Sequence, residues 1–164
     1  MDRIEHPRRP RIFNTPFETG LRSVFLLTAC YPAMLGLNRL VVFDHLVVHT
    51  EDVGGPPSMH PKDRSRAAEI LVRRRLVDSG LSLMQTRGLV ARIVSPAGFR
   101  YRAGEEAGSF VDMLSSTYFV ALKERAGWLA EHIEPMPDDE LSALVQSRMD
   151  EWEPEFQTGQ RQAP

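Results

Sequence analysis

The sequence has little cysteine and no long apolar run. Cys30 stands alone among 164 residues and within an apolar segment, so it cannot form an intramolecular disulfide and is expected to be buried. No apolar run approaches the roughly 20 residues that a membrane-spanning helix needs. The first residues are charged and interrupted by proline, and they lack the apolar centre of a secretory signal. We therefore expect a cytoplasmic protein that does not enter a membrane.

Sequence motifs of catalysis and of metal binding are also missing. There is no G-x-S-x-G motif, and Gly54-Gly55 lacks the downstream Lys-Ser/Thr of a phosphate-binding loop. His45 and His49 are one helical turn apart, but Leu46 stands where the zinc protease motif has glutamate. The sequence therefore predicts no catalytic residue, no metal and no cofactor. A small enzyme is the weakest interpretation of this chain.

The net charge of −2 conceals two blocks of opposite sign. Residues 62–102 contain ten basic and three acidic residues, whereas residues 103–164 contain four basic and thirteen acidic residues. Such a distribution indicates two different partners, or one partner that carries both signs. Alternatively, the two blocks face each other within one subunit or between subunits.

The N-terminal half predicts a basic arm followed by two helices. Residues 1–14 contain four arginines among prolines and no apolar periodicity, so we expect a flexible arm. Thr15, Pro16 and Glu18 form a helix start with a capping box. The run LVVFDHLVV predicts a second helix that ends near His49, although so many valines would also suit a buried strand.

The most informative stretch of the chain is a third helical region followed by two short β-branched or aromatic runs. The helix begins near Asp63 or Ser65, Ser79-Gly80 is expected to split it, and Gly88 is expected to end it. The runs VARIV and FRYR flank the turn SPAG, which predicts a β-hairpin. This order is typical of a winged helix-turn-helix.

The two faces of this hairpin are expected to differ. By the period of two in a strand, Phe99 and Tyr101 share one face and the neighbouring arginines share the other. We expect Ile93 to join the aromatic face, which packs on the helices. Arg100 and Arg102 are then left for solvent or for a partner.

The arginines of residues 62–102 are the candidate contacts to DNA or to a partner protein. Three consecutive helix positions cannot share one face, so at least one of the three arginines at 73–75 should cover apolar surface or pair inside. Base-specific contacts are not favoured, because Gln85 is the one amide side chain in this region that suits adenine. The candidate residues are Arg73, Arg74, Arg75, Arg87, Arg92, Arg100 and Arg102.

After the hairpin the pattern predicts further helices. Ser115 or Ser116 is expected to cap a helix whose apolar stripe runs to Ile133. The sequence therefore predicts a mainly α fold with a small β-hairpin (α+β), in which a winged helix-turn-helix core carries additional C-terminal helices. We expect one domain over residues 15–134, a C-terminal helix over 135–153 and a disordered tail over 154–164.

Four segments of the sequence together resemble a known family. They are FNTPFE, RLVVFDHLVVHTEDVGGPPSMHP, EILVRRRLVDSGLSLMQTRGLV and GFRYRAGEEAGSFVDML. They resemble the small middle component of bacterial ABC-three-component systems, which are similar to Lamassu anti-phage defence. The resemblance covers roughly Arg9 to Ile133, and its most specific part is the string from His49 to Ser58.

The resemblance implies a non-catalytic adaptor. In such systems a middle subunit joins an SMC-like ABC ATPase to an effector, often a nuclease, in anti-phage or anti-plasmid defence. It also implies that the basic region meets DNA, if at all, through the complex, and it offers a candidate docking loop. The residues of that loop are Gly54, Gly55, Pro56, Pro57 and His60. The competing interpretation is a stand-alone winged-helix transcriptional regulator, which would bind a palindromic DNA site as a homodimer.

Overall fold

Helix α1 (Pro16–Cys30) begins where the sequence predicts it. The Thr15 hydroxyl accepts a hydrogen bond from the Glu18 amide at 3.2 Å, and this bond satisfies one of the free amides of the first turn. Helix α2 (Leu37–Val48) confirms the helical alternative for the valine-rich run. Its N-cap residue is Gly36, which together with Leu35 pairs with a strand.

The computed structural model describes residues 15–61 and 66–148. The predicted basic arm over residues 1–14 and the predicted tail over residues 154–164 lie outside the described residues, as does the end of the predicted C-terminal helix. None of the helices within the described ranges is both long and apolar enough to cross a membrane.

Helix α3 (Arg66–Gln85) is continuous, so the predicted break at Ser79-Gly80 is wrong. Gly80 is the point where α3 packs closely on α1: a Cβ atom there would lie 2.6 Å from the Gly20 nitrogen. The predicted stop is confirmed, because Gly88 has φ +70°, a conformation that favours glycine.

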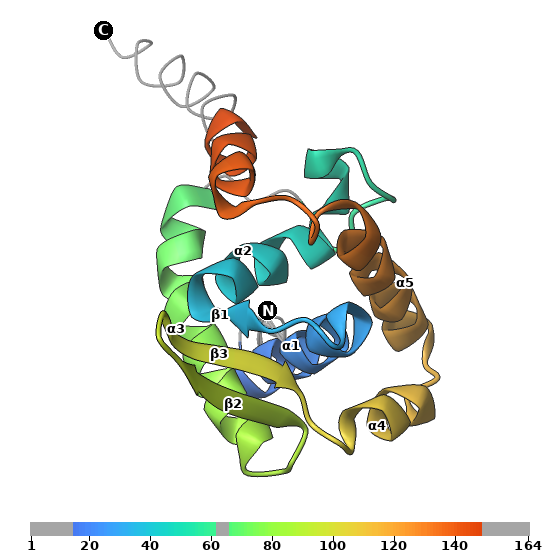
Figure 1. Ribbon diagram of the computed structural model, residues 1–164. Helices are drawn as coiled ribbons and strands as arrows, with labels where there is room; N and C mark the ends of the chain where they lie inside the picture. The colour runs from blue at the N-terminus through green and yellow to red at the C-terminus, as the bar shows by residue number, and fades with distance from the viewer. Residues whose placement is uncertain (1–14, 62–65, 149–164) are drawn as a thin grey trace, which may run out of the picture.

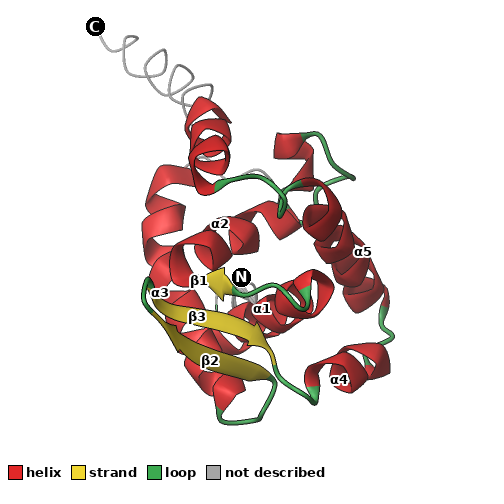
Figure 2. Ribbon diagram, viewed as in Figure 1, coloured by secondary structure: helices red, strands yellow, loops and turns green. Residues whose placement is uncertain are grey.

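The sheet contains the predicted hairpin and one further strand. Strands β2 (Val90–Ser95) and β3 (Gly98–Ala103) pair antiparallel, and β1 (Leu35–Gly36) pairs with the other edge of β3. The order is therefore β1-β3-β2. Figure 2 shows this sheet on one side of the molecule, and helices and loops make up the rest of the described residues.

Two details of the predicted hairpin are wrong. Ile93 pairs directly with Arg100, and directly paired residues point to the same face, so Ile93 lies on the arginine face. Phe99 shares the face of the buried Tyr101 but lies next to the hairpin turn and is 53% exposed.

The C-terminal part of the described chain packs on α1 away from the sheet. Helix α4 (Ala107–Met113) is short, and α5 (Thr117–His132) begins at Ser116, whose hydroxyl accepts from the Phe119 amide at 3.4 Å. A further helix occupies residues 138–148. Figure 1 shows α1 enclosed by α2, α3, α5 and the sheet.

The hydrophobic core lies around α1, which contacts α2, α3, α4, α5 and β3. Fully buried members include Val24, Leu26, Phe43 and Leu122. Cys30 is 7% exposed, and burial raises the pKa of its thiol to about 12, so it is the inert core residue that the sequence predicts. The predicted class, mainly α with a small sheet, is confirmed.

Candidate functional site

The hairpin carries arginines on both of its faces. The guanidinium carbon of Arg92 lies 4.3 Å from the ring centre of Phe99, which is cation–π geometry. Arg100 and Arg102 lie on the opposite face. At the tip, Phe99 and its directly paired neighbour Val94 are 53% and 78% exposed. The hairpin therefore combines positive charge with exposed apolar surface.

The three consecutive arginines of α3 have different environments. Arg73 is 4% exposed, and its Nη1 lies 2.6 Å from Asp44 Oδ2. Arg74 donates to the Asn38 side chain, and Arg75 is exposed. Arg73 therefore pairs inside the protein, and the predicted surface role does not apply to it, because α2 places the buried Asp44 carboxylate against it.

A buried ion cluster joins three helices. The Asp44 carboxylate of α2 accepts hydrogen bonds from Arg22 Nε of α1 at 2.7 Å and from Arg73 Nη1 of α3 at 2.6 Å. The side chains of these residues are 3%, 0% and 5% exposed for Arg22, Asp44 and Arg73. Arg22 Nη2 also donates to the Thr19 hydroxyl at 3.2 Å. One carboxylate thus lies between two guanidinium groups in the interior.

The pKa values of Asp44 and Arg22 favour their charged forms. Burial alone would raise the pKa of Asp44, but the charges of Arg22 and Arg73 and their hydrogen bonds lower it. Burial acts to lower the pKa of Arg22, and Asp44 together with Tyr118 raises it above its usual value. The buried groups are therefore ionised, and removing one of them while its partner stays charged destabilises the folded protein strongly.

This ion cluster is not among the features predicted from the sequence. The available signal was a charged residue within an apolar helical segment, as in GLRSVFLL and VVFDHLVV. Charged residues are almost never fully buried unless they are paired, so Arg22 and Asp44 could each have been marked as needing a partner. The identity of that partner depends on how the helices pack.

The candidate docking loop has a fixed shape. After the 3-10 helix η2 (Thr50–Val53), Gly54 adopts φ +79°, a conformation that favours glycine. The Thr50 hydroxyl donates to the Pro56 carbonyl at 2.7 Å. The Ser58 amide donates to Glu51 Oε1 at 3.1 Å, and the Ser58 hydroxyl accepts from the Glu51 amide at 3.3 Å. These bonds close the loop on itself.

Helix α5 holds the loop from outside. Arg125 Nε donates to the Pro57 carbonyl at 2.8 Å. A Cβ atom at Gly55 would lie 2.9 Å from Trp128 Cζ3, so the indole ring packs directly on the glycine. The loop and the outer side of α5 therefore form one surface, on which Pro57 is exposed.

His60 connects the loop to the interior. Its Nε2 lies 3.5 Å from the Tyr118 hydroxyl oxygen. The centroids of the His60 and His49 rings are 6.1 Å apart, and those of the His49 and His45 rings are 4.6 Å apart. Burial and then the nearby Arg22 and Arg73 lower the pKa of His60 to about 4. His60 is therefore neutral at neutral pH. Within the described ranges, no group of three or more possible ligands is arranged to hold a metal ion.

The lowered pKa of His60 predicts a stability loss in mild acid. The unfolded state binds this proton near pH 6.5 and the folded state near pH 4, so stability falls as the pH drops through this window. The partial exposure of the ring screens the effect, and we expect about 1–2 kcal/mol. Urea unfolding between pH 7 and pH 4 measures it. A His60→Gln variant should show a shallower pH dependence, and an unchanged slope would contradict the assignment.

A small apolar pocket of about 280 Å³ lies where the first turns of α1 and α5 meet. It is lined by Phe17, Glu18, Leu21, Arg22, Tyr118, Phe119 and Leu122. Arg22 and Tyr118 connect it to the ion cluster and to His60. The pocket, the ion cluster and the loop are therefore linked to one another through these two side chains.

The fold and these surfaces define a small, mainly helical α+β protein with a basic hairpin and a loop of fixed shape. A family model described as ABC-three component (ABC-3C) system Middle Component 2 matches residues 12–155. Because this match spans most of the chain, the protein belongs to that family, and the predicted resemblance is confirmed. Comparisons with curated proteins and with solved structures found no match.

Proposed function

We propose that this protein is a non-catalytic adaptor of a cytoplasmic bacterial defence complex. It links an SMC-like ABC ATPase to an effector, most simply a nuclease, that acts against phages or plasmids. Membership of the Middle Component 2 family carries this proposal, because a middle component belongs to a system of three. DNA, where it is involved, is met through the complex.

The order of the elements supports a winged helix-turn-helix core as part of this proposal. A helix is followed by a short strand, two helices and a hairpin, and the short strand joins the hairpin in the order β1-β3-β2. In that arrangement α3 would be the helix that enters a DNA groove in related folds. Here Arg73 of that helix is committed to Asp44, which favours protein docking over DNA reading.

The positions of the two candidate surfaces suit an adaptor. Figure 1 shows the hairpin of β2 and β3 at one end of the molecule and the η2 loop beside α5 at the other. Two surfaces that lie far apart can engage two partners at once. We assign the loop of Gly54, Gly55, Pro56, Pro57 and His60 to one partner and the hairpin arginines to the other.

Affinity purification of the tagged protein from its native operon tests the adaptor function. The preparation is divided, one half is treated with nuclease, and both halves are analysed by mass spectrometry. We expect an SMC-like ATPase in stoichiometric amount in both halves. Recovery of the protein alone, together with promoter DNA that disappears on digestion, would instead identify a transcriptional regulator.

A further inference from the structure

Among the described residues, no helix packs on one face of the three-stranded sheet. Leu35 and its partner Tyr101 are 2% and 5% exposed and point to the core. Because side chains alternate along a strand, the residues on either side of them point outward. We call this the outer sheet face, and it contains Met34, Ile93, Arg100 and Arg102, with Tyr31 from the preceding turn.

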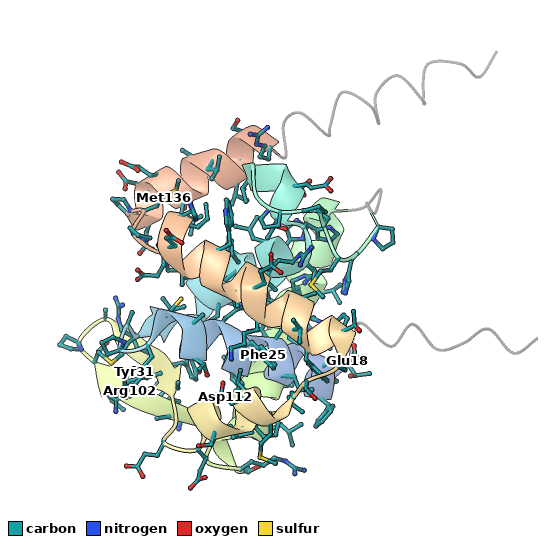
Figure 3. The ribbon with its side chains drawn as sticks, turned by 90° about the vertical axis from the view of Figure 1, so that its right-hand side faces the viewer. Glu18, Phe25, Tyr31, Arg102, Asp112 and Met136 are labelled. Carbon is teal, nitrogen blue, oxygen red and sulfur yellow. The ribbon has the colours of Figure 1, made fainter. Side chains whose placement is uncertain are left out.

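These residues form a connected surface. Arg100 Nη1 donates to the Met34 carbonyl at 3.5 Å, and Ile93 pairs directly with Arg100. In the view of Figure 3, Tyr31 and Arg102 both lie on the sheet side of the molecule. Tyr31 is 61% exposed and Met34 is 39% exposed. Large apolar side chains thus lie among the guanidinium groups.

The hairpin that forms most of this face carries only positive charge. Residues 86–103 contain four arginines and no acidic residue. Among the residues that the structure describes, neither Arg100 nor Arg102 forms an ion pair with a carboxylate. The ligand that complements this face therefore carries negative charge together with apolar groups.

We propose that the outer sheet face docks an acidic protein segment of another subunit, in which carboxylates flank one or two apolar side chains. This inference rests on the adaptor function proposed above and names the chemistry of one partner. Arginine, tyrosine and methionine are enriched in protein interfaces, and arginine and tyrosine supply much of the binding energy there. Guanidinium groups hold carboxylates through paired hydrogen bonds.

A protein segment fits this face better than DNA does. Phosphates are bound by arginine and lysine with hydroxyl, amide and backbone donors, whereas this face offers Tyr31, Met34 and Ile93 beside its two arginines. Apolar groups gain nothing from contact with phosphates. Contact with apolar side chains of a protein removes that surface from water.

Three variants of the full chain test the proposal within the complex purified from the operon. Arg100→Glu with Arg102→Glu reverses the charge of the face. Tyr31→Ser with Met34→Ser removes its apolar part and leaves both arginines. Lys123→Glu is the control, because it reverses an exposed charge on α5 whose ion pair with Asp112 is exposed at both ends. All five positions are solvent-accessible, so each variant should fold, which circular dichroism checks.

We expect both face variants to weaken binding of one subunit, about 10- to 100-fold in Kd, as is typical of interface anchors. The control should bind like the wild type, and added salt should weaken the wild-type interaction. If both face variants keep wild-type affinity for every subunit, the proposal is wrong although the adaptor function stands. If Arg100→Glu with Arg102→Glu weakens DNA binding, the control does not, and the serine variant binds all partners normally, the face serves DNA instead. If the wild type retains no subunit, both proposals fail.

Discussion

Replacing Asp44 by alanine is expected to destabilise the protein by about 3–5 kcal/mol, the cost of removing one member of a buried ion pair. The carboxylate lies 2.7 Å from Arg22 Nε and 2.6 Å from Arg73 Nη1, and it is fully buried. Its removal leaves two like charges close together in the interior. Urea unfolding at pH 7, followed by circular dichroism, measures the loss.

Two further variants separate charge from volume. Asp44→Asn keeps the size and shape of the side chain, so a loss close to that of alanine would assign the effect to charge. Asp112→Ala is the matched control, because its ion pair with Lys123 is exposed at both ends. Losing that pair should lower the free energy of unfolding by less than about 0.5 kcal/mol. An Asn variant as stable as the wild type would show that the cluster does not depend on the charge of Asp44.

The ion cluster is expected to keep its contribution to stability in mild acid. The pKa of Asp44 is lowered from 3.8, so its contribution to stability is complete above that pH. It is lost only as the pH falls further, through the lowered pKa of the folded state. The loss expected from His60 lies between pH 6.5 and pH 4, and the two groups can therefore be distinguished in one titration.

The features that the sequence predicts correctly depend on near neighbours. Thr15 caps α1 through an amide three residues away, Ser116 caps α5 in the same way, and Gly88 ends the preceding turn with its own backbone conformation. Each of these signals acts within one helical turn. Local chemistry was therefore enough to place most helix boundaries.

The features that were missed depend on distant parts of the chain. Strand β1 has two residues and exists because Leu35 pairs with Tyr101. The face on which Ile93 lies depends on register, since a slip of one residue moves every side chain to the other face. Helix geometry required one of the three consecutive arginines to leave the common surface, but only the packing of α2 on α3 shows that it is Arg73.

Gly80 shows the same limit, because its isolated occurrence suggested a helix break whereas the structure uses it for close packing. A Gly80→Ala variant is expected to lose about 2–3 kcal/mol of stability, which is typical of overpacking. The added Cβ would lie 2.6 Å from the Gly20 nitrogen and 2.7 Å from the Pro16 carbonyl oxygen. Both are backbone atoms, so α1 and α3 would have to separate. Thermal and urea unfolding measure the change.

Gly127→Ala is the matched control for this substitution. Gly127 lies within α5, and nothing approaches its Cβ position within 4 Å, so alanine there should stabilise the helix by about 1 kcal/mol. The same intrinsic gain acts at position 80, so the steric conflict there costs the measured net loss plus the gain measured at position 127. If Gly80→Ala were as stabilising as Gly127→Ala, the contact between α1 and α3 would accommodate a methyl group without steric conflict. The crossing that brings Arg22 and Arg73 to the same carboxylate would then not depend on the two glycines.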